Sequence, residues 1–384
     1  MEKKTCAIIP STSAPTLEPT SAPTLEPISI EEKINKIKSK MNNKNSKKEL
    51  LDICKQLNIK GCSSKSIQQV KDKINSVLAS EPSELFVDNP TQLPQEYTKG
   101  NIVLYSGDAI DKLNEVEDKS IQTICIDPPY NIGKDFWDNI ENYIEWLTSI
   151  ICKLETKLKP NGSFFIFHND MEQIAELIIS IKKNTKLIFR QMIVWNKRFE
   201  NSPKKGFLDG YIVKNDMHNW NKMAEYILFY TFDNSELIKK ERIKQNVSQQ
   251  TISQEIKSKT GGSTGWFSNI ETGKNYPTKE TMAPITKHLG LKYEDIVPKF
   301  NNQKTDHSVW NYDIAKKLSI HITPKPLNLL KNIILHTTDE NDTLLDCFAG
   351  TGSLGYAARE LNRNCILIEK EEKYCDYIIT QLNC

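Results

Sequence analysis

Short apolar runs, each followed by a polar or glycine-rich turn, alternate with helical stretches from residue 101 to the end of the chain. Continuous apolar runs bounded by turns are typical of buried parallel strands. The pattern predicts strands at residues 121–126, 163–168, 187–195, 225–230, 344–346 and 364–369, and a helix at 354–361. Strands that alternate with helices predict an α/β fold with a doubly wound, Rossmann-like sheet.

The first of these strands ends in an unusual turn, Asp127-Pro128-Pro129-Tyr130. Two prolines prevent both a continuing strand and an immediate helix, so we expect a rigid turn. It would hold a carboxylate, a free backbone carbonyl and an aromatic ring at the carboxyl edge of the sheet, where open α/β sheets bind ligands. Taken alone, a plain strand-end turn remains an alternative interpretation.

Methylation of an exocyclic amine suits this set of groups. The lone pair of adenine N6 is delocalised into the ring, which makes the amine a poor nucleophile. The Asp127 carboxylate and the Pro128 carbonyl can accept both N–H hydrogens and free the lone pair, and Tyr130 can stack on a flipped base. Transfer from a sulfonium then needs positioning more than covalent help. We therefore expect the catalytic residues to be Asp127, Pro128, Pro129 and Tyr130.

A glycine-rich turn follows the strand at 344–346. Gly350 and Gly352 allow the backbone to approach a ligand closely. The next strand ends at Glu369, and an acid roughly 20 residues after the glycines suits the two hydroxyls of a ribose. Gly355 also completes the spacing of a nicotinamide-binding loop, so the glycines alone leave that cofactor open. The pairing with the Asp-Pro-Pro-Tyr strand favours S-adenosylmethionine.

With both motifs in this order, the chain from about Asn101 onward resembles the β-class amino-methyltransferases of DNA. Their Asp-Pro-Pro-Tyr motif comes first, a target recognition region follows, and the Phe-x-Gly-x-Gly cofactor turn comes last. The segment His321-Ile322-Thr323-Pro324-Lys325-Pro326 and the pair Gly107-Asp108 also resemble segments of that family. The resemblance implies a cofactor site made of Asp108, Lys325, Asp346, Phe348, Ala349, Gly350, Gly352 and Glu369. This chain departs from the family at Cys347, commonly Pro, and at Ser353-Leu354, commonly Thr-Thr.

Residues 236–300 interrupt the α/β pattern with helical stretches. A helix capped by Ser248, a segment ending in Ile270-Glu271-Thr272-Gly273-Lys274 and a helix capped at Pro277-Thr278 resemble a helix-turn-helix of the Cro/repressor type. The recognition helix of that motif reads base edges in the major groove. The expected DNA-binding residues are Thr264, Ser268 and Asn269, joined by Lys197 and Arg198 of the polar loop 197–222 as phosphate contacts. For each lysine or arginine of that loop, a solvated surface side chain is an equally good interpretation.

The amino-terminal part has a different organisation. The eight residues at 12–19 repeat at 20–27, and this Pro/Thr-rich tract cannot bury a core, so residues 1–30 are expected to be a disordered tail. Residues 31–80 predict two helices, from Ser46 to Leu57 and from Lys65 to Val77, around a turn at Gly61. They resemble the small DNA-binding SAP module, and a plain helical hairpin is an equal alternative. Residues 81–100, with three prolines, are expected to be a linker to the catalytic halves, 101–235 and 301–384.

Composition limits the classes of function. The net charge is only +2, so contact with nucleic acid would depend on local patches. Nine cysteines include no C-x-x-C pair, and Cys125, Cys347 and Cys365 fall within apolar strands as small buried residues, which favours reduced thiols and an intracellular location. No apolar run approaches the length of a membrane span, no signal peptide is visible, and no metal site is expected.

The resulting hypothesis is a site-specific DNA methyltransferase of the restriction-modification type. It would move a methyl group from S-adenosylmethionine to N6 of a flipped adenine in double-stranded DNA. Asp127 in the first motif position is typical of adenine enzymes, whereas N4-cytosine enzymes usually carry Ser there. N4-cytosine methylation, or an inactive methyltransferase fold that acts as a DNA-binding regulator, are the alternatives. Besides double-stranded DNA, the resemblance allows a separately encoded restriction endonuclease and a homodimer as partners.

Overall fold

The computed structural model describes residues 46–56, 66–79, 94–131, 140–197, 199, 223–256, 265–301, 307–315 and 324–383. The chain divides into two compact units, residues 1–92 and 93–384. Several predictions lie outside the described residues: the tail at 1–30, the Gly61 turn, most of the linker, Arg198 and Thr264.

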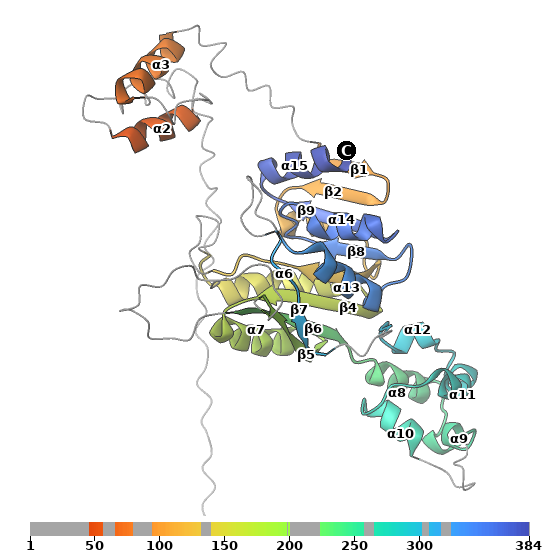
Figure 1. Cartoon of the computed structure of the whole chain (residues 1–384). Coiled ribbons are helices and arrows are strands. Elements are labelled where there is room, and N and C mark those ends of the chain that lie inside the picture. Colours follow the sequence, from red (N-terminus) through yellow and green to blue (C-terminus); the bar gives the residue numbers. More distant parts are fainter. Residues whose placement is uncertain are drawn as a thin grey trace, which may run out of the picture. The chain divides into compact units, whose positions relative to one another are not determined.

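The described part of the first unit consists of two helices that contact each other, α2 (Lys47–Gln56) and α3 (Ile67–Ala79) (Figure 1). Their buried side chains are Leu50, Ile53, Cys54, Val70 and Ile74. Ser46 and Ser66 each exchange hydrogen bonds with the residue three positions later, which satisfies free backbone N–H groups at the helix start. The second helix therefore begins at Ile67, two residues after the predicted start.

Within the described residues, the second unit is built on one sheet of nine strands. The strands are β1 (Glu96–Lys99), β2 (Ile102–Ser106), β3 (Ile121–Ile126), β4 (Leu158–His168), β5 (Leu187–Asn196), β6 (Ala224–Phe232), β7 (Val309–Asn311), β8 (Thr343–Asp346) and β9 (Asn364–Glu369). Their order is β1-β2-β9-β8-β3-β4-β6-β5-β7. The central strands β2, β9, β8, β3 and β4 run parallel, whereas β6 runs antiparallel to both of its neighbours.

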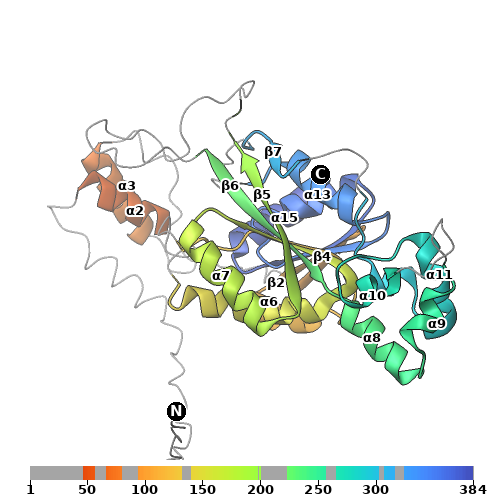
Figure 2. The ribbon, with the colours of Figure 1, turned by 90° about the horizontal axis from the view of Figure 1, so that it is seen from below.

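Helices cover both faces of this sheet. The long helices α6 (Tyr143–Lys157) and α7 (Met171–Asn184) share one hydrophobic cluster with the sheet, together with the short α5 (Ala109–Lys112) and the 3-10 turn η1 (Leu113–Glu115). The opposite face packs on α13 (Leu327–Thr337), α14 (Ser353–Glu360) and α15 (Glu372–Asn383) (Figure 2).

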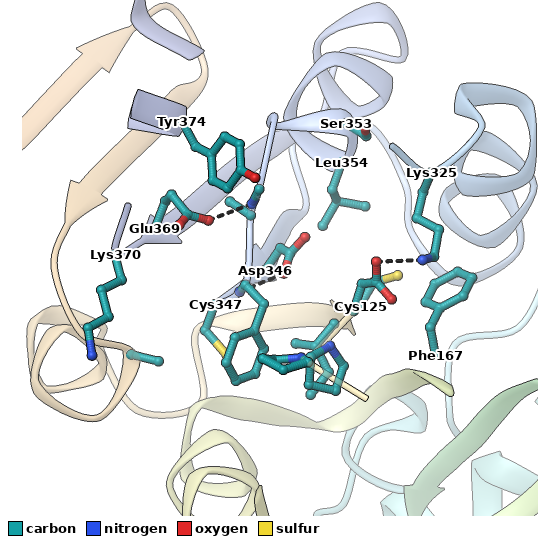
Figure 3. A pocket seen from close by; sticks show the side chains of 18 of the residues that line it. Cys125, Phe167, Lys325, Asp346, Cys347, Ser353, Leu354, Glu369, Lys370 and Tyr374 are labelled. Carbon is teal, nitrogen blue, oxygen red and sulfur yellow. Dashed lines mark hydrogen bonds and ion pairs between the residues drawn. The ribbon is translucent and has the colours of Figure 1, made fainter. Parts of the chain in front are cut away.

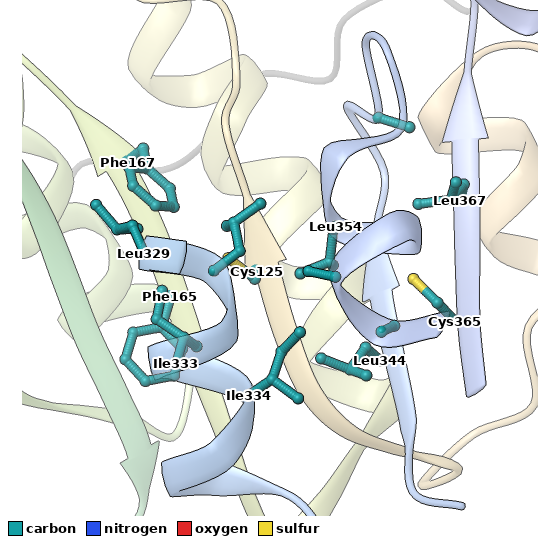
Figure 4. Close-up of a cluster of buried hydrophobic side chains, with 14 of the residues drawn as sticks. Cys125, Phe165, Phe167, Leu329, Ile333, Ile334, Leu344, Leu354, Cys365 and Leu367 are labelled. Carbon is teal, nitrogen blue, oxygen red and sulfur yellow. The ribbon is translucent and has the colours of Figure 1, made fainter. Parts of the chain in front are cut away.

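Strand β4 has apolar residues at successive positions, and its place in the sheet explains this pattern. Phe164 and Ile166 belong to the cluster on the α6/α7 face, whereas Phe165 and Phe167 belong to the cluster on the other face (Figure 4). Successive side chains of a strand point to opposite faces, so a strand buried on both faces needs apolar residues at every position. The three-layer arrangement confirms the predicted α/β fold class, with a mixed sheet.

Strands β3 and β8 lie side by side at the middle of the sheet, and this position creates the site. The chain continues from β8 to β9 on one side and from β3 to β4 on the other. Connections that leave two adjacent parallel strands in opposite directions open a crevice at their carboxyl ends. The Asp-Pro-Pro-Tyr turn follows β3 and the glycine turn follows β8, so both motifs meet at this crevice.

The described residues between 235 and 296 form five short helices with a hydrophobic core of their own: α8 (Ser235–Lys244), α9 (Gln249–Ser253), α10 (Trp266–Glu271), α11 (Lys279–Leu289) and α12 (Tyr293–Ile296). Phe267 is fully buried in this core, and Trp266 packs against it. Ser248 caps α9 and Thr278 caps α11. The Asn234 side chain joins this helical insert to the sheet, since it donates to the carbonyls of Pro160 and Ile296 at 2.9 and 3.0 Å.

Candidate active site

A cavity of about 440 Å³ lies at the carboxyl ends of β3 and β8 (Figure 3). Eleven of the twelve residues expected at the catalytic and cofactor sites line it: Asp108, Asp127, Pro128, Pro129, Tyr130, Lys325, Asp346, Phe348, Ala349, Gly350 and Glu369. They come from five separate segments of the chain. The tertiary structure therefore brings the two motifs to one cavity.

One end of the cavity is formed by the glycine turn and the end of β9. The Glu369 carboxylate accepts hydrogen bonds from the backbone N–H groups of Gly350, at 2.6 Å, and Glu371, at 2.8 Å. Burial raises the pKa of Glu369 to about 7 and the pKa of Asp346 to about 8. Asp346 in turn accepts from the Phe348 N–H at 2.9 Å, which holds the turn against the strand end. Two acids are thus present next to a backbone turn, one of them protonated at neutral pH.

Asp108 lies at the same end of the cavity, after β2. Its Oδ1 caps α5 by accepting from the Ile110 N–H at 3.0 Å, and its Oδ2 lies 3.2 Å from Lys370 Nζ. Gly107, with φ of +145°, donates its N–H to the Glu369 carbonyl at 2.8 Å. This glycine turn therefore ties the end of β2 to the end of β9.

Gly352 is the one expected cofactor residue that does not line the cavity. Its φ is +80°, and a Cβ built on it would lie 2.9 Å from Cγ1 of Ile378 on α15. The glycine is thus needed for the left-handed start of α14 and for close packing on α15. The ligand contact expected of Gly352 stays a prediction, and the structure adds a packing role for this residue.

The other end of the cavity holds the catalytic turn. The Tyr130 hydroxyl donates to Asp127 Oδ1 at 2.6 Å, and the ammonium of Lys325 lies 2.5 Å from Asp127 Oδ2. Lys325 was expected among the cofactor residues, and it does line the cavity, but its ion pair is with the predicted catalytic acid (Figure 3).

Glu225 and Lys197 extend this cluster, and sequence analysis did not assign Glu225 to the site. Glu225 is buried on β6, lies 3.8 Å from Lys325 through Oε2, and forms an ion pair with Lys197 through Oε1. Lys197 is also buried, with Nζ 4.2 Å from the centre of the Trp195 ring. The expected phosphate contact of Lys197 is therefore corrected, because its ammonium is enclosed by Glu225 and Trp195.

A buried histidine is linked to the Asp-Pro-Pro-Tyr turn through a chain of hydrogen bonds. His168 Nδ1 accepts from the Asp170 N–H at 3.1 Å, which leaves its other nitrogen, Nε2, to donate to the Tyr143 hydroxyl at 3.0 Å. Tyr143 then donates to the Pro129 carbonyl at 2.7 Å. Burial lowers the pKa of His168 to about 4, so the ring is neutral at pH 7. Tyr143 thus occupies the Pro129 carbonyl, while among the described residues no protein donor is found on the Pro128 carbonyl.

The positions of Glu225 and His168 explain why the sequence pattern missed them. Both are polar residues at the ends of apolar strands, a signal that by itself predicts only a strand boundary. Because β6 is antiparallel to β4, its first residues lie beside the last residues of β4, with His168 paired to Tyr226. Glu225 therefore reaches the same edge of the sheet as Asp127.

Two of the expected base-reading residues, Ser268 and Asn269, are in the described part of the helical insert and do not line this cavity. Both are partly exposed on α10. No cluster of residues able to hold a metal ion is present in the part of the chain that the structure describes. The same part contains no helix long and apolar enough to cross a membrane.

Comparison with known proteins reveals relatives that cover most of the chain. The type II methyltransferase M1.MboII of Moraxella bovis is 28% identical over 291 residues, which cover 73% of this chain and 96% of that protein. The DNA adenine methyltransferase YhdJ of Escherichia coli strain K12 is 28% identical over 284 residues, 70% of this chain and 78% of that protein. The solved structure of the cytosine-N4-specific PvuII DNA methyltransferase aligns with a TM-score of 0.48 at 15% identity, covering 75% of this chain and 94% of that one.

The profile of the DNA methylase family matches residues 121–381. The matched segment contains both turns, the buried charge cluster and the helical insert. Since it spans more than half of the 384 residues, the chain belongs to the N6/N4 DNA methylase family.

Proposed function

We propose that this protein is a site-specific DNA methyltransferase that uses S-adenosylmethionine to methylate N6 of a flipped adenine in double-stranded DNA. The observation that carries the proposal is that the Asp-Pro-Pro-Tyr turn and Glu369, a suitable acceptor for ribose hydroxyls, line the same cavity. Asp127 and Pro128 supply two acceptors for one amine. In the N6/N4 DNA methylase family, the target amine is either adenine N6 or cytosine N4.

The residues at the β9 end fit S-adenosylmethionine. Glu369 would accept from the ribose hydroxyls, and the turn at Phe348, Ala349 and Gly350 would lie against the nucleoside. The methyl group of the sulfonium is electrophilic, and this is the chemistry that the cofactor supplies. Asp108 would lie near the adenine ring of the cofactor, as the family resemblance implies.

At the β3 end, the chain would activate the amine by hydrogen bonding. The Asp127 carboxylate and the Pro128 carbonyl accept one N–H each, which pulls the nitrogen toward a tetrahedral geometry and makes its lone pair available. Tyr130 stacks on the flipped base. Tyr143 holds the turn through the Pro129 carbonyl, so the acceptors are in place before the base arrives.

Adenine is proposed over cytosine because the acceptor is an aspartate. The E. coli relative YhdJ, a DNA adenine methyltransferase by name, supports the same choice at 28% identity. The helical insert is proposed to read the target sequence as a helix-turn-helix, and the first unit to contact DNA as a SAP-like module. A separately encoded restriction endonuclease and a homodimer are proposed partners, as for type II enzymes.

Sequencing of plasmid DNA from an expressing host, with detection of modified bases, tests the proposal directly. The expected result is N6-methyladenine at one short motif, absent from a host that expresses the Asp127→Ala variant. N4-methylcytosine at a motif would establish the alternative amine. A plasmid free of both modifications, with folded protein present, would show that the chain is not an active methyltransferase.

A further inference from the structure

Glu225 lies beside both donors that occupy the catalytic carboxylate. The Tyr130 hydroxyl is 2.6 Å from Asp127 Oδ1 and 3.5 Å from Glu225 Oε2. The Lys325 ammonium is 2.5 Å from Asp127 Oδ2 and 3.8 Å from the same oxygen of Glu225. The same oxygen, Glu225 Oε2, is therefore a second acceptor within reach of both the Tyr130 hydroxyl and the Lys325 ammonium.

The other side of Glu225 is already neutralised. Its Oε1 pairs with Lys197, and the side chains of both residues are about nine-tenths buried. A carboxylate placed between two ammonium groups can bind one more tightly without leaving the other unpaired. Glu225 can thus receive Lys325 while it keeps Lys197.

An amine that binds Asp127 must compete with the donors already there. The target amine needs a carboxylate oxygen in good hydrogen-bond geometry, and Tyr130 and Lys325 each hold one. The Lys325 side chain is only 10% exposed, so its ammonium cannot turn to bulk water when it is displaced. A shift of roughly 1 Å toward Glu225 would bring the Lys325 ammonium within hydrogen-bond distance of Glu225 Oε2.

We propose that Glu225 is a positioning residue that accepts Lys325 and the Tyr130 hydroxyl when the target amine takes Asp127. Both donors stay paired throughout, and the oxygens of Asp127 become available to the amine. Glu225 also lines the cavity, but its proposed effect passes through Lys325 and Tyr130 and needs no contact with the substrate. The inference rests on methylation of an exocyclic amine and is the same for adenine N6 and cytosine N4.

The test uses three variants of the full chain: Glu225→Gln, Lys197→Met and the two combined. The rate is measured in a single turnover. The substrate is unmodified DNA that contains the motif methylated by the wild type, and both this DNA and S-adenosylmethionine are saturating. The dissociation constants of DNA and cofactor are measured alongside, with thermal unfolding as the check on folding. Glu176→Gln, an exposed glutamate on α7, is the matched control and is expected to behave as wild type.

The double variant separates the proposed role from a structural one. If Glu225 only neutralises Lys197, its charge is not needed once Lys197 is replaced. The double variant should then be as fast as the Lys197→Met variant. If Glu225 receives the donors of Asp127, the double variant should remain slower than Lys197→Met by roughly 10- to 100-fold, the effect of removing one charged hydrogen-bond partner. The dissociation constants should stay within about twofold, because phosphate contacts and the β9 end of the cavity are untouched. A Glu225→Gln protein that fails to fold would not hide the answer, because the double variant leaves no buried charge unpaired at this position.

The outcomes also separate this inference from the proposed function. An active wild type together with a double variant as fast as Lys197→Met would overturn the role of Glu225 and leave the methyltransferase intact. A wild type that modifies neither adenine nor cytosine would overturn both.

Discussion

Lys325 Nζ lies 2.5 Å from Asp127 Oδ2, although the two residues are 198 positions apart in the chain. This ion pair links the start of α13 to the turn after β3 and connects the cofactor half of the chain to the catalytic half. It also means that the predicted catalytic acid meets a buried cation before any substrate arrives.

Asp127→Ala should abolish methyl transfer while binding of S-adenosylmethionine largely survives. Asp127 accepts from the target amine and stabilises the transition state, so its loss should lower the single-turnover rate by about 100- to 1,000-fold or more. Calorimetry should find a cofactor dissociation constant within a few-fold of wild type. Asp376→Ala, an exposed acid on α15, serves as the control. A variant at Asp127 that methylates at the normal rate would show that the catalytic assignment is wrong.

Binding of S-adenosylmethionine should strengthen as the pH rises from 6 to 8. Burial raises the pKa of Glu369 to about 7, and ribose hydroxyls donate better to the ionised carboxylate. Below that pKa, affinity should fall by up to about tenfold for each pH unit. Calorimetry of the free protein across this range measures the effect, and Glu369→Gln should weaken binding and flatten the pH profile. A wild-type profile as flat as that of the variant would remove Glu369 from the cofactor site.

Gly352→Ala should destabilise the fold through contacts outside the cavity. The new Cβ would lie 2.9 Å from Ile378 at a φ of +80°, so strain and overpacking should cost on the order of 1–3 kcal/mol in the free energy of unfolding. Chemical denaturation measures this loss. Combined with Ile378→Ala, which removes the Cγ1 atom that the new Cβ would approach, Gly352→Ala should cost less than the sum of the two single substitutions. Full stability of the Gly352→Ala protein, with weakened cofactor binding, would assign Gly352 to the ligand instead.

The free energy of unfolding should fall as the pH drops from about 6.5 toward 4. Burial lowers the pKa of His168 to about 4, against 6.5 for an unperturbed histidine, so between these values the unfolded chain binds a proton that the folded chain does not. The group's contribution is present above pH 6.5 and decreases by on the order of 3 kcal/mol as the pH falls through this window. Denaturation at several pH values should show a weaker dependence for His168→Gln than for wild type. Exposed His307→Gln is the control, and equal pH dependence in the His168 variant would contradict the prediction.

Replacing Ser268 and Asn269 with Ala should relax or shift the methylated motif. A recognition helix reads base edges, whereas the Asp-Pro-Pro-Tyr pocket meets only one flipped base. Each lost base contact should cost roughly 1–3 kcal/mol in discrimination, with no change in cofactor affinity. The set of methylated sites, compared at one salt concentration, is the measurement. An unchanged motif at an unchanged rate would place recognition in the loop 197–222 or in the first unit.

The class of fold, the two chemical turns and their order could be predicted from the amino-acid sequence alone. Residues 121–126 and 364–369 were predicted as strands with the bounds that the structure gives to β3 and β9. Such strands are buried on both faces, so their apolar runs are continuous and their polar ends are visible in the sequence. The turns were equally visible, because two prolines restrict the backbone locally and two closely spaced glycines permit conformations that other residues rarely adopt.

The residues that surround Asp127 and the packing role of Gly352 became visible only in the folded structure. Glu225, Lys197 and Lys325 meet because β6 runs antiparallel beside β4 and because α13 begins next to β3, and neither arrangement has a local signature. Gly352 belongs to the packing of α14 on α15 for the same reason. Ion pairs and close packing depend on distances between segments that are remote in the chain, and residue type and spacing along the chain do not specify those distances.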